Sequence, residues 1–513
     1  MKLKSILSLG LICSGFSLNA MATVDQPNVL LLVVDDLKPV LGAYGNDEIP
    51  TPNIDRLAAQ GTVMQNNYCQ QAICAASRMS MFTGLRPDST KVWDLNTFIE
   101  DSNPKAKTMQ QVFKESGYTT AGAGKVMHGS KNHSKQSWST PFTYNRELPY
   151  NPDHPIPAHD SAYYQNENTH KVYDQMNASG LKGWGARNKY MQQHDAMPAT
   201  ECLDLPDDAY LDGALANWAN ANLEEYARTG ESFFLTVGFS KPHLPFAAPK
   251  KYWDMFDRQD IELAEFQEHA KGSPGFAYHP FAELRAYTDI PSEWSQPISD
   301  VQQAELIHGY YACVAYIDAQ IGKILDTLHE TGLDKNTIVV LWGDHGFHLG
   351  DHGLWTKHTN FENATEAPLI ISAPGFSGGK NAKSMTESVD IFPTLIDLTG
   401  LEAPYELEGV SLVPVMKDED ASVKDYSISQ FPGWKNRMGY ALRDPQYRMI
   451  IWMKNDWRTS MPYSDSFVET IELYDYEADP LESVNLANDP DYKEVRAMLE
   501  QEMIEYFAQH EAS

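Results

Sequence analysis

Four short, continuously apolar segments constrain the fold of this chain most strongly. They are NVLLLVV (28–34), FFLTVGF (233–239), TIVVLW (337–342) and PLIISA (368–373). Runs of this length and composition are typical of strands buried on both faces of a parallel sheet. Helical patterns lie between them, so the sequence predicts an α/β domain with a large, mostly parallel sheet sandwiched by helices.

Helix boundaries are marked by Pro and Gly. Helices are predicted within TPNIDRLAAQG (51–61), within TMQQVFKESG (108–117) and over 304–331, where Gly332 supplies a C-terminal stop signal. The stretch from about 130 to 200 is rich in His, Asn, Pro and Tyr and has weak periodicity. It is predicted to be a long insertion or a set of surface loops.

The chain divides into three predicted parts. Residues 1–22 combine Lys2 and Lys4, an apolar core and the small-x-small sequence Ala20-Met21-Ala22, which predicts a cleaved signal peptide and export to the periplasm or the exterior. A large N-terminal domain is predicted over 23–420. No run after the leader approaches the ~20 apolar residues that a membrane-spanning helix needs, so no membrane span is expected.

Residues 421–513 differ in sequence pattern from the rest of the chain. YRMIIWMKN and IELYDYEADPLESVNLA predict short strands and turns, and DYKEVRAMLEQEMIEYFAQH predicts a terminal amphipathic helix. These patterns together indicate a smaller α+β domain with antiparallel strands, packed on the first.

Charge and cysteine usage exclude some functions. The formal net charge of −30 argues against nucleic acid or an anionic membrane as a partner. Beyond the leader there are four cysteines, and their spacing shows no paired C-x-x-C zinc pattern. Cys74 lies too close to Cys69 for a comfortable disulfide, and pairing among Cys69, Cys202 and Cys313 stays open.

Polar residues follow three of these predicted strands and a further candidate strand, GYTTAGAG (117–124). Asp35 and Asp36 follow the first, Asp344 and His345 follow TIVVLW, SKPH (240–243) follows FFLTVGF, and Lys125 and His128 follow GYTTAGAG. An Asp at a strand end is more often a cap or turn residue, and a lone Lys or His is more often solvated. Ligands of parallel α/β sheets, however, bind beyond the carboxyl ends of the strands. Four strand ends with such residues therefore predict a site.

The carboxylates predict a metal. Asp35, Asp36 and Asp344 would repel one another strongly without a cation, and their oxygens suit a hard divalent ion, Ca²⁺ or Mg²⁺. His345 is a further candidate ligand, although imidazole is unusual for calcium. Arg78, Lys125, His128 and His243 would then surround an anionic substrate with positive charge and proton donors.

The segment CAASRMSMFTG (74–84) resembles the signature of type I sulfatases, in which C-x-P-S-R begins a helix that ends in T-G. NVLLLVVDD, TPNIDRLAAQG, GDHGFHLGDHGLWTKHTNFENATEAPLIISAPG, DIFPTLIDLTG and ELYDYEADPLESVNLA resemble other sulfatase segments, in the same order. GKVMH, SKPHLPF and WTKHTNFE are most similar to the iduronate-2-sulfatase branch. The resemblance covers most of the chain and implies the sulfatase fold of the alkaline phosphatase superfamily.

The resemblance also implies roles for individual residues. In this family the cysteine is oxidised after translation to Cα-formylglycine, which makes Cys74 the precursor of the nucleophile. Arg78 would hold the formylglycine, Lys125 and Lys357 the sulfate oxygens, and His128 would stand beside the nucleophile while His243 protonates the leaving oxygen. The implied Ca²⁺ ligands are Asp35, Asp36, Cys74, Asp344 and His345.

The chemistry of an aldehyde suits sulfate esters. A hydrated formylglycine offers two hydroxyls: one would attack sulfur, and the other, deprotonated by His128, would expel sulfate. Charge on the sulfate oxygens must be offset first. Ala76 stands where the family motif has proline, and we still expect conversion by the formylglycine-generating enzyme.

The predicted function is a secreted sulfatase acting on a sulfated oligo- or polysaccharide, either a 2-sulfated uronate, an ulvan-type or a glycosaminoglycan-type substrate. Two alternatives are a phosphonate or phosphate ester hydrolase of the same superfamily and a non-catalytic carbohydrate-binding protein. The complete set of polar residues argues against the latter.

Overall fold

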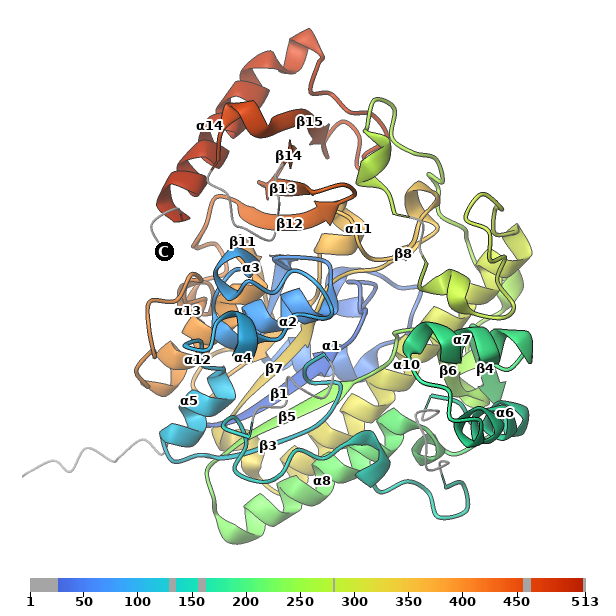
Figure 1. The fold of residues 1–513 in the computed structure, drawn as a ribbon. Helices are drawn as coiled ribbons and strands as arrows, with labels where there is room; N and C mark the ends of the chain where they lie inside the picture. The colour runs from blue at the N-terminus through green and yellow to red at the C-terminus, as the bar shows by residue number, and fades with distance from the viewer. Residues whose placement is uncertain (1–25, 129–134, 156–162, 280–281, 455–462, 511–513) are drawn as a thin grey trace, which may run out of the picture.

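The computed structural model describes residues 26–128, 135–155, 163–279, 282–454 and 463–510 (Figure 1). The predicted signal peptide, 1–22, lies outside these residues. In the described part of the chain, a seven-stranded sheet has the strand order β11-β2-β10-β7-β1-β5-β3. Its strands are β1 (Asn28–Val34), β2 (Thr62–Tyr68), β3 (Thr119–Gly124), β5 (Phe233–Phe239), β7 (Thr337–Gly343), β10 (Leu369–Ser372) and β11 (Lys380–Glu387).

The sheet is mostly parallel, as predicted. β1 is parallel to both of its neighbours, β5 and β7, and β3 is parallel to β5. The prediction for 368–373 was wrong in direction, because β10 runs antiparallel to β7 and to β2. The connection from β7 to β10 contains only short elements such as α11 (Glu362–Thr365), and antiparallel neighbours need no long crossover.

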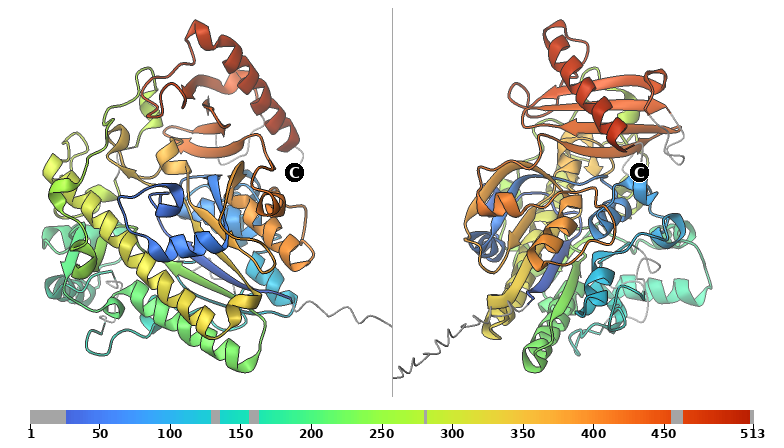
Figure 2. Two further views of the ribbon diagram at one scale, coloured as in Figure 1. Left: turned by 180° about the vertical axis from the view of Figure 1, so that it is seen from behind. Right: turned by 90° about the vertical axis from the view of Figure 1, so that its left-hand side faces the viewer.

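The central strand β1 is buried on both faces, which explains its continuous apolar run. Leu30, Leu32 and Val34 pack into one hydrophobic core, and Val29, Leu31 and Val33 into another on the opposite face. Such alternation follows from the two-residue period of a strand. Helices cover both faces (Figure 2). The first core includes residues of α1 (Pro52–Gln60), α8 (Leu211–Thr229) and α10 (Asp300–Glu330); the second includes residues of α2 (Cys74–Thr83), α5 (Met109–Glu115) and α12 (Ile391–Thr399).

The helices predicted within 51–61, within 108–117 and over 304–331 are present as α1, α5 and α10. α10 starts four residues earlier than predicted, because Ser299 caps it and its side chain accepts a hydrogen bond from the Gln302 N–H. The expected loops at 130–200 instead contain α6 (Glu167–Ala178) and α7 (Trp184–Gln193). Their few buried apolar residues, such as Val172 and Met191, form a small separate cluster, which explains the weak periodicity.

The C-terminal part forms a second, antiparallel sheet with the order β12-β13-β14-β15. The residues of β14 alternate: Ile450 and Trp452 pack into a core shared with the large domain, whereas Met449 and Ile451 pack into the core that includes residues of the terminal helix. The predicted boundary at 420/421 falls between α13 and β12. The elements are α13 (Val413–Lys417), β12 (Ser427–Gly433), β13 (Arg437–Arg443), β14 (Tyr447–Lys454), β15 (Val468–Asp475) and α14 (Lys493–His510).

A buried ion-pair network joins the C-terminal sheet to α11 and to the residues just before it. The fully buried Arg448 of β14 pairs with Glu362 of α11 and donates to the Asn360 carbonyl oxygen at 2.6 Å. Arg443 of β13 also pairs with Glu362, at 3.1 Å. Removing one partner of such a buried pair typically costs about 3–5 kcal/mol, so the network fixes how the two sheets meet.

Two further features bear on the sequence predictions. All four described cysteines are free thiols, so no disulfide forms among Cys69, Cys74, Cys202 and Cys313. Among the described residues, no helix has both the length and the apolar character that crossing a membrane requires.

Candidate active site

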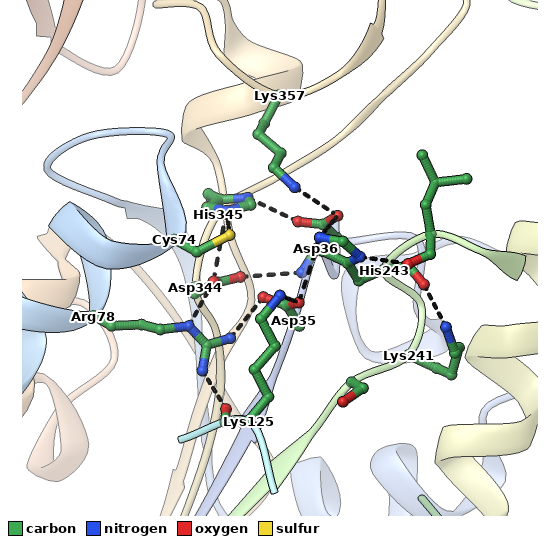
Figure 3. A network of polar contacts seen from close by, with 12 residues as sticks. Asp35, Asp36, Cys74, Arg78, Lys125, Lys241, His243, Asp344, His345 and Lys357 are labelled. Carbon is green, nitrogen blue, oxygen red and sulfur yellow. Dashed lines mark hydrogen bonds and ion pairs between the residues drawn. The ribbon is translucent and has the colours of Figure 1, made fainter. Parts of the chain in front are cut away.

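The polar residues predicted from the strand ends lie together at one edge of the central sheet (Figure 3). Asp35 and Asp36 follow β1, and Asp344 and His345 lie at the end of β7. His243 follows β5, and Lys125 follows β3. Cys74 is the first residue of α2, and its Sγ lies 3.3 Å from His345 Nε2.

Arg78 connects three of these segments. Its side chain is fully buried, donates to Asp35 Oδ1 at 2.7 Å and to Asp344 Oδ2 at 2.9 Å, and donates to the Val126 carbonyl oxygen at 2.8 Å. Burial raises the pKa of Asp35, but the charges of Lys125 and Arg78 outweigh it and hold that pKa well below its usual range. Asp35 is therefore ionised at neutral pH.

Asp36 has an unusual backbone. Its φ of 61° lies in the left-handed region, which Asp tolerates better than most residues. Its N–H donates to Asp344 Oδ1 at 3.0 Å, and its carbonyl oxygen accepts from Tyr310 Oη at 2.8 Å. These two bonds fix the carboxylate between Lys357, whose Nζ lies 3.0 Å from Oδ2, and His345.

Gly238 of β5 lets the backbone at Lys125 pack closely against that strand. The Lys125 N–H donates to the Gly238 carbonyl oxygen at 2.7 Å. A Cβ on Gly238 would lie 2.3 Å from the Lys125 carbonyl carbon, so only glycine fits there. The Lys125 ammonium group then pairs with Asp35.

The donor set fits a hard divalent cation. Candidate ligand atoms of Asp35, Asp36, Cys74 and His243 lie within 4.8 Å of one another, and so do those of Cys74, Asp344 and His345. Asp36 Oδ1 is buried and accepts no hydrogen bond from any residue that the structure describes. Burial lowers the pKa of His345, yet Asp344 and Cys74 raise it to about 10, which indicates a local excess of negative charge that a cation would offset. In a formylglycine enzyme, an oxygen would replace the Cys74 sulfur in this set.

Glu283 was not predicted from the sequence. Its carboxylate lies 2.8 Å from His243 Nε2 and 3.0 Å from Lys357 Nζ, so it links two of the predicted site residues. Glu283 precedes a short 3-10 turn in the sequence AELRAY, which contains no strand end and no motif. Lys357 lies between Thr356 and His358, whose φ values of 75° and 65° are unusual for such residues and indicate a constrained segment.

Two more residues lie beside the cluster. Burial, followed by the charge of Lys125, lowers the pKa of His128 to about 3, so this histidine is neutral at physiological pH. Lys241 donates to the carbonyl oxygens of His243 and Pro245 at 2.7 and 2.6 Å. Lys241 therefore holds the loop that carries His243 rather than facing the carboxylates.

Residues 27–401 match the family model Sulfatase, and residues 350–509 match N-sulphoglucosamine sulphohydrolase, C-terminal. The chain belongs to the sulfatase family. Iduronate 2-sulfatase of Homo sapiens is 32% identical to it, over 95% of this chain and 96% of that protein. A sulfatase of Formosa agariphila is 30% identical, over 92% of this chain and 85% of that protein.

Among solved structures, the phosphonate monoester hydrolase of Agrobacterium radiobacter shares the fold, with a TM-score of 0.71 and 21% identity over 94% of this chain and 96% of that one. The comparisons confirm the predicted family, the similarity to the iduronate-2-sulfatase branch and the α/β fold. They also confirm the enzyme class: this sulfatase is a sulfuric ester hydrolase. The roles of individual site residues stay predictions.

Asp36→Asn tests whether the cluster holds a metal. The substitution keeps the size of the side chain but removes the charge of the carboxylate, whose Oδ1 accepts no hydrogen bond from the described residues. We expect Ca²⁺ affinity, measured by calorimetry on chelator-treated protein, to fall at least about 10–100-fold, the loss typical of perturbed metal sites. The surface variant Asp326→Asn, in the exposed part of α10, should bind Ca²⁺ like the parent. Unchanged affinity in Asp36→Asn would exclude Asp36 as a ligand.

Proposed function

We propose that this sulfatase hydrolyses sulfate monoesters of a sulfated carbohydrate, with Cα-formylglycine at position 74 and Ca²⁺ as cofactor. The observation that carries the proposal is the position of Cys74. It begins a buried helix, and its sulfur lies within a cluster of carboxylates and histidines that also contains Arg78 and two lysines. A free thiol has no evident structural purpose there, whereas a nucleophile for an anionic ester does.

Binding the sulfate group requires positive charge in a chain that is strongly acidic overall. Lys125 and Lys357 pair with Asp35 and Asp36 and are placed to turn toward sulfate oxygens once a cation offsets those carboxylates. The first-turn N–H groups of α2 at Cys74, Ala75 and Ala76 lack intrahelical acceptors and add further donors. Bound Ca²⁺ would supply additional charge for the sulfate oxygens and hold the residue at position 74.

Ala76 in place of proline fits this geometry. It is the third residue of α2, where the backbone N–H has no intrahelical acceptor, so proline and alanine both suit the position. We therefore propose that the formylglycine-generating enzyme converts Cys74 during maturation. The hydrated aldehyde would supply the nucleophilic hydroxyl.

His243 is the proposed general acid. Burial and the charges of Lys125 and Lys357 lower its pKa, but Asp36 and Glu283 raise it, and the net pKa lies above the usual value. A protonated His243 can donate to the leaving sugar oxygen, an effect typically worth ~10²–10⁴-fold in rate. Neutral His128 is the proposed base near the nucleophile.

Similarity to iduronate 2-sulfatase over nearly the whole chain supports the proposed substrate class. We propose a 2-sulfated uronate, in a glycosaminoglycan-type or ulvan-type saccharide. Export through the predicted signal peptide would bring the enzyme to such polymers outside the cytoplasm. Phosphonate or phosphate ester hydrolysis is the alternative activity, since a phosphonate monoester hydrolase shares the fold.

A substrate panel tests the function. The panel contains 4-nitrophenyl sulfate, 4-nitrophenyl phosphate, a phenyl phosphonate ester, and di- and tetrasaccharides with or without a 2-sulfated uronate. We expect the greatest kcat/KM for 2-sulfated saccharides, with sulfate release followed by ion chromatography. Saccharides that are sulfated only at other positions serve as matched controls. Turnover of the phosphate or phosphonate ester without any sulfate ester would contradict the proposal.

Glu283→Gln tests the assignment of the general acid. Because Glu283 raises the pKa of His243, its removal should lower that pKa. The proton on His243 is lost as pH rises through its pKa, so the alkaline limb of the kcat/KM profile should move to lower pH. With 4-nitrophenyl sulfate, whose leaving group needs little protonation, the limb should move less. An alkaline limb that stays in place for the saccharide would contradict the role of the Glu283–His243 pair.

A further inference from the structure

A cavity lies next to the active site. Its volume is about 740 Å³, large enough for a sugar unit. Three parts of the chain form its walls: residues within 267–279 and 285–303, the segment 350–355, and residues 434–437, which are the turn after β12 and the first residue of β13. We propose that this cavity, defined by these walls, binds an anionic sugar unit of the substrate that neighbours the unit carrying the cleaved sulfate. The inference rests on the proposed function.

Three connections place the cavity beside the site. Trp355 lines the cavity, and Lys357, two residues later, contacts Asp36. Arg285 lines the cavity, two residues after Glu283 of the site. The ring of His279, another lining residue, packs against that of His358 with centroids 5.3 Å apart. A saccharide held in the site would therefore extend its next unit toward this cavity.

The lining offers aromatic surfaces to a sugar ring. Trp294 and Trp434 both line the cavity and are 72% and 57% exposed, respectively. Large aromatic side chains rarely stay so exposed without a partner, and their flat faces suit the C–H groups of a pyranose ring. Phe276 adds a further ring, which the Arg437 guanidinium covers at 4.4 Å from the centroid.

The charge of the lining indicates an anion. The chain has 70 acidic and 40 basic residues, yet the described lining residues include no Asp or Glu. They include Arg285, Lys435 and Arg437. Arg437 is paired with Glu469, and Arg285 donates to the carbonyl oxygens of Trp294 and Gln296 and so supports the loop. Lys435, in the turn at the rim, is the basic residue best placed to meet a carboxylate or sulfate of a sugar.

Two buried polar atoms in the wall lack protein partners. Gln303 Oε1 and His352 Nδ1 have no hydrogen-bond partner in the part of the chain that the structure describes. Their side chains are only 6% and 2% exposed, and both line the cavity. Buried polar groups are normally satisfied, so such atoms suit hydroxyl groups of a ligand. Aromatic faces, a basic rim and unpaired polar atoms together favour a sugar over an apolar ligand.

Kinetics on substrates of different length test the proposal. The variants are Trp294→Ala, Trp434→Ala and Lys435→Glu, with Met498→Ala on the exposed side of α14 as the control. For a tetrasaccharide with a terminal 2-sulfated uronate, we expect KM to rise about tenfold in each tryptophan variant, since one stacking contact is worth about one factor of ten. The kcat/KM for 4-nitrophenyl sulfate should stay unchanged. Lys435→Glu should weaken the binding of anionic saccharides more than the binding of carboxyl-reduced saccharides.

An unchanged tetrasaccharide KM in all three variants would overturn the proposal. Calorimetry with a desulfated uronate tetrasaccharide distinguishes failure of this proposal from failure of the proposed function, because the binding measurement needs no turnover. If the parent protein hydrolyses no sulfated saccharide, the proposed function fails, and this binding measurement still tests the cavity. Binding that is weakened by the tryptophan variants supports the site, and binding that is unchanged contradicts it.

Discussion

The site depends on the close approach of three buried carboxylates. Asp35, Asp36 and Asp344 are fully buried at two adjacent strand ends, where like charges repel strongly. Arg78, Lys125 and Lys357 offset part of that repulsion through direct pairs. Asp36 Oδ1 lies 3.5 Å from His345 Nδ1 but accepts no hydrogen bond in the described part of the chain, which leaves this oxygen available to a cation. A divalent cation, followed by an anionic substrate, completes this charge balance in the proposed enzyme.

The sheet is what brings the carboxylates together. β1 lies between β5 and β7, all three run in the same direction, and their carboxyl ends therefore meet at one edge. The two hydrophobic cores on either face keep this central strand out of water. The Arg448–Glu362 network then fixes the C-terminal sheet against the loop that follows Lys357, and the β12–β13 turn reaches the cavity beside the site.

Residues next to regular strands could be predicted from the sequence, whereas residues on irregular segments could not. The run at 28–34 has a pattern typical of a doubly buried strand, and its end located Asp35 and Asp36. Glu283 and the cavity residues Trp294 and Trp434 lie in loops whose path depends on tertiary contacts. The same limit explains the missed β2 and β11, whose sequences TVMQNNY and KNAKSMTE are polar, and the wrong direction of β10. Direction depends on the connection, which a single apolar run does not encode.

In the proposed mechanism, position 74 carries an aldehyde in the active enzyme. Peptide mass spectrometry on protein purified from its native host, together with the specific activity of the same sample, tests for this aldehyde. We expect the peptide spanning Cys74 to carry formylglycine, the converted fraction to scale with activity across preparations, and Cys74→Ala to be inactive. Fully active protein with an unmodified Cys74 thiol would contradict this mechanism.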